Sequence, residues 1–198
     1  NAMATGAALV AIILAFGPVS GAHMNPVVTL AAAMLGRTSW KEVPLYVAAQ
    51  VGGGAFGTVL ANLMFGLPAV SLSSHQRNGS GLWLGELVAT FGLLAVIYGV
   101  ASSGRPAFAP FAVGAYITGA YWFTSSTSFA NPAVTLARTL SDTFAGIAPA
   151  SAPMFILMQL AGGGLGLAAV GLLYPAHKLI RDRKEMQACL PEFSSPSM

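Results

Sequence analysis

Two Asn-Pro pairs, Asn25-Pro26 and Asn131-Pro132, each begin a short apolar segment of the sequence. Asn is a strong helix N-cap and Pro is favoured at the first helical position, so both pairs predict helix starts. The segments that follow, residues 25–35 and 131–144, are too short to cross a bilayer and are typical of re-entrant or core helices. One Asn-Pro pair would predict only a helix start, whereas two such segments predict a shared role.

The chemistry of such a pair is the stabilisation of a neutral, oxygen-bearing molecule. A helix N-terminus carries roughly half a positive charge and unpaired N–H groups. If the two short helices enter a membrane from opposite faces, these N-termini meet near its midplane and disfavour cations and protons there. The side-chain amides of Asn25 and Asn131 can then donate hydrogen bonds to a passing oxygen. This arrangement predicts passage of a solute rather than the breaking of a bond.

The elements that must position the two asparagines are apolar helices. Of the 198 residues, 55% are hydrophobic and only 8% are charged, whereas soluble domains have about 25% charged residues. A spanning helix needs about 20 mostly apolar residues. Five segments fit, at residues 2–19, 44–66, 82–101, 108–123 and 152–174. We predict an all-α membrane protein with five spanning helices and two re-entrant half-helices in residues 1–175, followed by a polar, basic tail at 176–198.

The placement of basic residues predicts the orientation in the membrane. Arg37, Lys41 and Arg105 lie in loops that fall on the same side as the tail, which holds four more basic residues, while Arg77 falls opposite. The positive-inside rule then makes the tail cytoplasmic, in the plasma (inner) membrane. Basic and aromatic residues are not interleaved as a nucleic-acid surface requires, so we expect the lipid bilayer and no nucleic acid as a partner.

The two short helices belong to an internal repeat. Residues 25–31 match residues 131–137 at six of seven positions, and residues 50–57 resemble residues 159–166. The segment 108–123 maps onto the start of the chain, but 82–101 maps to positions before residue 1. Restoring that helix would give two halves of three spans with opposite orientations, an inverted repeat with its binding site near the midplane. We therefore expect the first helix of the pattern to be missing, by truncation or an internal start, and a residual tag before Met3 is the alternative.

The runs Ser-Gly-Ala-His-Met-Asn-Pro-Val (20–27) and Phe-Ala-Asn-Pro-Ala (129–133) resemble the paired NPA motifs of the major intrinsic proteins, the aquaporins and glycerol facilitators. The resemblance covers residues 1–175. It implies an aquaporin-like fold, a homotetramer with one pore in each protomer, no cofactor, no metal and no enzymatic activity. It also implies that the pore motifs are Asn25, Pro26, Val27, Asn131, Pro132 and Ala133, where Val27 departs from the usual Ala.

A second departure from the family concerns the pore constriction. In most members an Arg directly follows the second motif, and here that position is Val134. Counting from the two asparagines carries the other constriction positions over to Thr5, Gly119 and Ser128. This ring would have no charge and no aromatic residue, so we expect a wider pore than that of a water channel. The run 116–147 further resembles a bacterial subgroup encoded with arsenic-resistance genes, which implies arsenite, antimonite or methylated arsenicals as solutes beside small polyols.

Three polar residues near the motifs need an interpretation. Glu86 lies in a span, where a carboxylate is a functional candidate by default, but the resemblance favours a structural acceptor for loop N–H groups near the second half-helix. We interpret His23 as a pore-adjacent histidine with its hydrogen bonds satisfied. Arg138 follows Asn131 by about two helical turns, and we expect it to pair with loops or with Asp142 rather than to gate.

The leading hypothesis is a passive channel for small neutral solutes such as water and glycerol-like polyols. A secondary active transporter would need an ion-coupling carboxylate facing the site, and only Glu86 is available. A non-conducting structural subunit is the third hypothesis, because without the missing helix one wall of the pore would be open. One cysteine and the absence of any His/Cys cluster or catalytic triad predict neither a metal site nor an enzyme.

Overall fold

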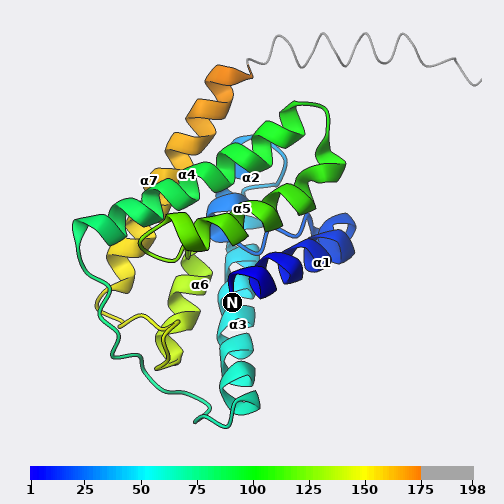
Figure 1. The fold of residues 1–198 in the computed structure, drawn as a ribbon. Coiled ribbons are helices and arrows are strands. Elements are labelled where there is room, and N and C mark those ends of the chain that lie inside the picture. Colours follow the sequence, from blue (N-terminus) through cyan, green and yellow to red (C-terminus); the bar gives the residue numbers. More distant parts are fainter. Residues whose placement is uncertain (175–198) are drawn as a thin grey trace, which may run out of the picture.

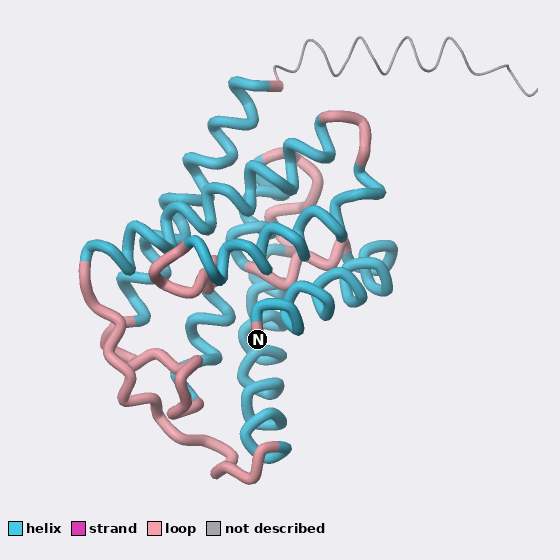
Figure 2. The backbone as a smooth tube through the Cα atoms, viewed as in Figure 1, coloured by secondary structure: helices cyan, strands magenta, loops and turns pink. Residues whose placement is uncertain are grey.

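A computed structural model describes residues 1–174 of the chain, so the predicted tail lies outside the described residues. Within them the chain folds into helices joined by loops, with no strand (Figure 2). The helices are α1 (Ala2–Ser20), α2 (Pro26–Met34), α3 (Val43–Met64), α4 (Ser80–Ser102), η1 (Pro106–Phe108), α5 (Ala109–Phe123), α6 (Pro132–Ala137), η2 (Arg138–Leu140) and α7 (Ala152–Leu173), where η denotes a 3-10 helix. The predicted all-α class is confirmed.

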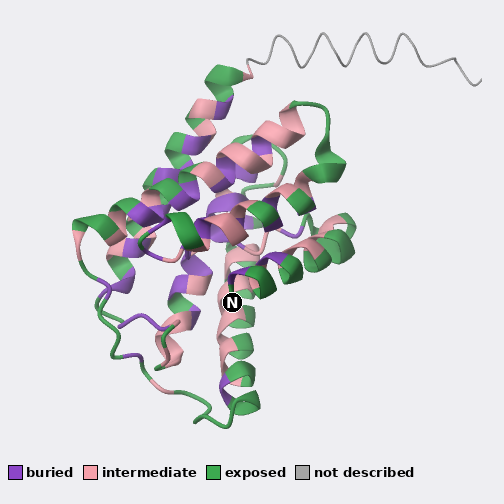
Figure 3. Ribbon diagram, in the orientation of Figure 1, coloured by how far each residue is buried: buried purple, intermediate pink, exposed green. Residues whose placement is uncertain are grey.

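The helices α1, α3, α4 and α7 are long and apolar enough to cross a membrane, with 19 to 23 residues each. The fifth predicted span corresponds to α5, which has only 15 residues and is preceded by η1. Much of the apolar surface of α1 and α3 is exposed, whereas buried residues gather where α2, α4, α5 and α7 meet (Figure 3). This pattern fits helices whose outer faces contact lipid rather than water.

Glycines allow the closest helix contacts. The helix α7 packs on α4, and α1 packs on α5 (Figure 1). A Cβ at Gly162 or Gly166 would overlap a backbone carbonyl of α4, and Gly6 and Gly114 face each other between α1 and α5. Small residues let membrane helices approach closely enough for backbone contact. The α7 glycines therefore fix this helix against the element that carries Glu86.

The two half-helices have different lengths. The helix α2 has nine residues and α6 has six, followed by the 3-10 turn η2. The expected extent of the second half-helix, to residue 144, is therefore too long. Its chain leaves the helix because Ser141 has an extended backbone and donates to Asn62 Oδ1 at 2.7 Å, while Asp142 accepts from Ser74. These loop hydrogen bonds replace the helical ones.

Candidate pore

Each half-helix begins with an asparagine that caps it. Asn25 and Asn131 have extended backbones, and each is followed by Pro at the first helical position. The Oδ1 of Asn25 accepts from the N–H of Val27 at 3.0 Å, and the Oδ1 of Asn131 accepts from Ala133 at 3.0 Å. The side-chain oxygens are thus turned toward their own helices. The amide nitrogens point away from the helices.

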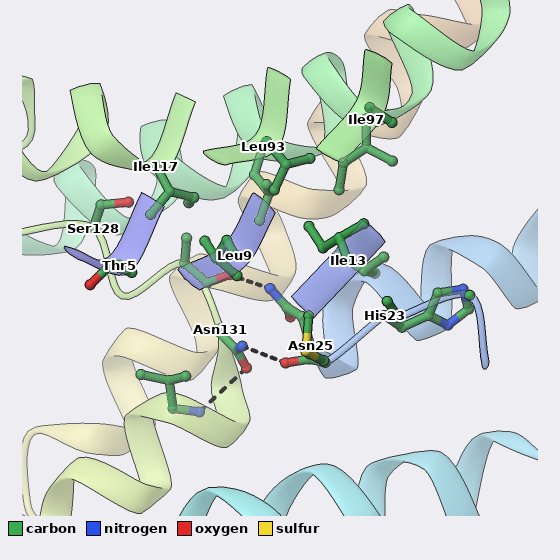
Figure 4. Close-up of a pocket in the computed structure, with 18 of the residues that line it drawn as sticks. Thr5, Leu9, Ile13, His23, Asn25, Leu93, Ile97, Ile117, Ser128 and Asn131 are labelled. Carbon is green, nitrogen blue, oxygen red and sulfur yellow. Dashed lines mark hydrogen bonds between the residues drawn. The ribbon is translucent and has the colours of Figure 1, made fainter. Parts of the chain in front are cut away.

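These amide nitrogens join the two motifs. Asn25 Nδ2 donates to the carbonyl of Ala130 at 2.7 Å, and Asn131 Nδ2 donates to the carbonyl of Met24 at 2.8 Å (Figure 4). Both carbonyls belong to residues with a positive φ, 49° for Ala130 and 44° for Met24, which is uncommon outside glycine. Each amide uses one of its two N–H groups in this bond, which leaves the second N–H without a protein acceptor within residues 1–174.

A cavity of about 340 Å³ passes the two asparagines. Its middle is lined by apolar side chains, including Leu9, Ile13, Leu93 and Ile117 (Figure 4). We call its two ends the Arg138 end, lined by Thr5, Tyr121, Ser128, Phe129 and Arg138, and the Arg37 end, lined by Gly21, Ala22, His23, Arg37 and Tyr98. The lining of the cavity is thus mainly apolar, with polar groups at the asparagines and at its two ends.

The pore-motif residues divide into two groups. Asn25 and Asn131 line the cavity. The other four, which follow them in the motifs, are buried behind the cavity wall and are not among its lining residues: Pro26, Val27, Pro132 and Ala133. Val27 occupies the space beside Gly163, where a Cβ would overlap its Cγ1. The larger side chain at this motif position is therefore accommodated by a glycine of α7.

The predicted constriction ring is assembled only in part. Thr5, Ser128 and Val134 line the same cavity, but Gly119 is not among its lining residues. The wall that α5 contributes includes Ile117 and Tyr121. Because side chains four residues apart share a helix face and those two apart do not, Gly119 lies off this face. The spacing of Val113, Ile117 and Tyr121 in the sequence is the signal that could have identified Tyr121.

Arg138 contacts a loop residue, as expected, but its hydrogen bond goes to Tyr121 of α5 and not to Asp142. Its Nη2 donates to the Tyr121 hydroxyl at 3.0 Å, and its guanidinium lies 4.2 Å from the centroid of the Phe129 ring. Asp142, its expected partner, instead accepts from Ser74. The Tyr121 hydroxyl also lies 3.3 Å from Thr5 Oγ1. A charge and an aromatic residue therefore stand at the Arg138 end, where the predicted ring had neither.

Arg77 is buried behind this end of the cavity, 6% exposed. Its Nε donates to the carbonyl of Gly146 at 2.8 Å and its Nη2 to that of Phe144 at 2.8 Å. Its guanidinium also lies 4.9 Å from the centroid of Phe129. Burial first, and the positive charge of Arg138 second, lower the pKa of Arg77. Arg77 thus joins the loops around the Arg138 end, a role that the sequence did not reveal.

Glu86 is fully buried and is not among the lining residues of the cavity. Its Oε1 accepts from the N–H of Phe129 at 2.8 Å, and its Oε2 accepts from the N–H of Ala130 at 2.8 Å. Gln159 Nε2 donates to the same Oε2 at 2.6 Å. The carboxylate therefore supports the loop that precedes the second motif, and its four lone-pair sites are largely occupied by protein donors.

His23 lines the cavity at the Arg37 end and packs against Tyr46, with ring centroids 5.4 Å apart. Its Nδ1 is buried and has no hydrogen-bond partner in the described part of the chain. The sequence-based expectation of a satisfied histidine is therefore wrong for this nitrogen. The imidazole contributes a polar edge to the passage.

Comparison with known proteins agrees with this geometry. The family model described as "Major intrinsic protein" matches residues 1–128. The aquaglyceroporin AqpS of Rhizobium meliloti (strain 1021) is 50% identical over 91% of this chain and 78% of its own length. The aquaporin NIP1-4 of Oryza sativa subsp. japonica is 35% identical, and the chain spans 64% of it.

Among solved structures, the aquaglyceroporin from Plasmodium falciparum aligns with a TM-score of 0.68 over 91% of this chain and 83% of that chain. At 22% identity this similarity concerns the fold. The paired capped half-helices, the cavity between them and the matching family model lead to one assignment. The chain belongs to the major intrinsic protein family, whose members are membrane channels and not enzymes.

Proposed function

We propose that this protein is a passive channel of wide bore for small neutral solutes that carry hydroxyl groups: glycerol-like polyols, water and undissociated arsenite or antimonite, with methylated arsenicals in the same class. The observation that carries this proposal is Val134, which lines the cavity at the position that directly follows the second motif. A valine there leaves apolar space where most of the family has an arginine. The similarity to a protein named an aquaglyceroporin supports polyols as the class.

The cavity chemistry favours neutral solutes over ions. The walls beside Asn25 and Asn131 are apolar, so an ion would lose its hydration shell without finding replacements. Two helix N-termini point at the same place, and their positive ends disfavour cations. A hydroxyl oxygen can accept from the remaining amide N–H of either asparagine. The few polar groups that line the cavity orient the solute but bind it only weakly.

A transporter mechanism has little support in this geometry. Coupling to an ion gradient would require a carboxylate that exchanges protons or ions with the cavity. Glu86 lies outside the lining and already accepts three hydrogen bonds from Phe129, Ala130 and Gln159. A non-conducting subunit is the alternative, and a measurement of solute flux would reveal it. We further propose the plasma (inner) membrane, a cytoplasmic tail and a homotetramer as the setting of the channel.

Stopped-flow light scattering on proteoliposomes tests the proposal, with water, glycerol and arsenite gradients applied in turn. We expect fast, unsaturable entry of all three and no ion current. Val134→Arg should reduce glycerol and arsenite entry about tenfold and water entry less, because a long cationic side chain fills the apolar space. Val134→Leu is the control that adds bulk without charge. Unchanged polyol entry in Val134→Arg would contradict the constriction, and no flux in the wild type would favour the non-conducting subunit.

A further inference from the structure

The cavity has a cationic group that the family's motif pattern does not predict. Arg138 follows Val134 by four residues, so it lies on the same face of the chain, about 6 Å further from the motif. Both side chains line the cavity. The position that directly follows the motif is therefore apolar, and a guanidinium stands about one turn beyond it.

We infer that Arg138, positioned by Tyr121, is a selectivity-determining residue that forms a second, displaced constriction at the Arg138 end. This inference deepens the proposed function and rests on it. In this proposal a solute passes the Arg138 guanidinium first, then the apolar side chains of Val134 and Ile117, and then the asparagine pair. The pore is wide at Val134, and the selection among solutes takes place at Arg138.

Two contacts hold the guanidinium in place, a hydrogen bond to Tyr121 and the stacking on Phe129. The Tyr121 hydroxyl accepts from Arg138 Nη2 at 3.0 Å and lies 3.3 Å from Thr5 Oγ1. These contacts from Arg138 through Tyr121 to Thr5 link η2, α5 and α1 at the Arg138 end of the cavity. The guanidinium of Arg138 lies 4.2 Å from the centroid of the Phe129 ring, and that of Arg77 lies 4.9 Å from the same centroid. Stacking on an aromatic face and a directional hydrogen bond together restrict a side chain that is otherwise flexible.

The positive charge of Arg138 acts on the cavity rather than on a carboxylate. The acidic groups of the surrounding loops and helices are engaged elsewhere, since Asp142 accepts from Ser74 and Glu86 accepts from loop N–H groups and Gln159. Arg77 adds a second positive charge behind Phe129. Within residues 1–174 the Arg138 guanidinium has no carboxylate partner, so it repels cations and offers donors to a hydroxylated neutral solute.

The planar shape of the guanidinium and its positive charge contribute separately to the exclusion of solutes. Lysine would keep the positive charge but lose the planar fork that stacks on Phe129 and bonds to Tyr121. Leucine would remove both the charge and the donors. Tyr121→Phe would keep the charge and release the guanidinium from its hydrogen bond. These three variants distinguish exclusion by charge from exclusion by size.

The test uses proteoliposomes of the whole chain and compares entry of glycerol, xylitol and water, together with proton leak reported by a trapped pH-sensitive dye. Arg138→Leu should raise xylitol entry relative to water about tenfold and should open a proton leak. Arg138→Lys should raise xylitol entry but keep the leak low. Tyr121→Phe should fall between wild type and Arg138→Leu for xylitol. Arg105→Leu removes an exposed cation outside the cavity and is the matched control.

The outcomes separate the inference from the proposed function. A conducting wild type with Arg138→Leu and Tyr121→Phe both indistinguishable from Arg105→Leu would overturn the displaced constriction alone. A wild type without flux above empty liposomes would overturn the proposed function and this inference with it. If Arg138→Leu does not reconstitute, Tyr121→Phe decides, since it keeps all charges. A xylitol-to-water ratio equal to that of wild type in this variant would be evidence against the positioning role.

Discussion

The two repeats build their half-helices in the same way but support them differently. In the first, Gln50 Nε2 donates to Thr29 Oγ1 at 2.8 Å, and in the second Gln159 Nε2 donates to Thr135 Oγ1 at 2.8 Å. Gln159 Nε2 also donates to Glu86, whose carboxylate accepts from the loop that precedes the second motif. Gln50 Oε1, by contrast, has no partner within the described residues.

The helices that follow the two half-helices, α3 and α7, also differ in how closely they are packed. The α7 glycines Gly162 and Gly166 lie against backbone carbonyls of α4, whereas Gly53 and Gly57 of α3 have open space where a Cβ would stand. Only Val43 and Asn62 are buried in α3. The second motif is therefore supported by a buried carboxylate that the first lacks, and its scaffold helix α7 packs closely on α4, whereas Gly53 and Gly57 of α3 meet no neighbour. This comparison predicts that substitutions at equivalent positions have unequal effects.

Glu86→Ala should show the largest effect. It leaves two loop N–H groups and Gln159 without an acceptor in a buried site, a loss of about 3–5 kcal/mol of stability. We expect a clearly lower Tm by circular dichroism in detergent. Glu42→Ala is the control, because Glu42 accepts one exposed hydrogen bond from Ser39 and should change stability by less than about 0.5 kcal/mol. Equal Tm values for the two variants would refute the supporting role of Glu86.

A smaller but more direct contrast comes from one glycine in each repeat. Gly162→Ala should lower stability by about 1–3 kcal/mol, because its Cβ would overlap the Leu87 carbonyl and force α7 away from α4. Gly53→Ala should be neutral or stabilising by about 0.5–1 kcal/mol, since alanine is the better helix former and the space is open. Thermal unfolding of both variants measures the difference. A similar loss in Gly53→Ala would indicate that this face of α3 is packed in the assembled protein.

The sequence predicted what depends on local chemistry and periodicity. The starts of both half-helices follow from Asn-Pro capping, and the repeat follows from matched residues, so the amino-acid pattern alone was enough to bring Asn25 and Asn131 together. The end of α6 could not be predicted in this way, because Ser141 and Asp142 leave the helix for partners in a distant loop. Apolar composition alone extended that helix too far.

The constriction shows a different limit. Counting back from Asn131 to α5 crosses a loop in which Thr127, Ser128 and Ala130 have positive φ. The position carried over from the family, Gly119, is not among the lining residues, whereas Tyr121, two residues later on α5, lines the cavity. The partnership of Tyr121 with Arg138 is tertiary and has no sequence signature. Only the four-residue spacing on α5 carried partial information about which face meets the cavity.

The two glutamines give the finest test of the comparison. Gln159→Ala removes a donor from Glu86 and a partner from Thr135 in a fully buried site, and should cost about 2 kcal/mol of stability. Gln50→Ala removes one hydrogen bond to Thr29 from a partly buried residue, and should cost about 0.5–1 kcal/mol.

A double-mutant cycle then shows why Gln159→Ala should lower stability more than Gln50→Ala. If the Glu86 carboxylate is what makes Gln159 matter more, Gln159→Ala should cost much less in the Glu86→Ala background, and Gln50→Ala should cost the same in both backgrounds. Residues in one hydrogen-bond network couple, whereas residues that share no partner add. Additive losses for Gln159 and Glu86 would mean that the two repeats differ in helix packing alone, with Gly162 rather than the carboxylate as the cause.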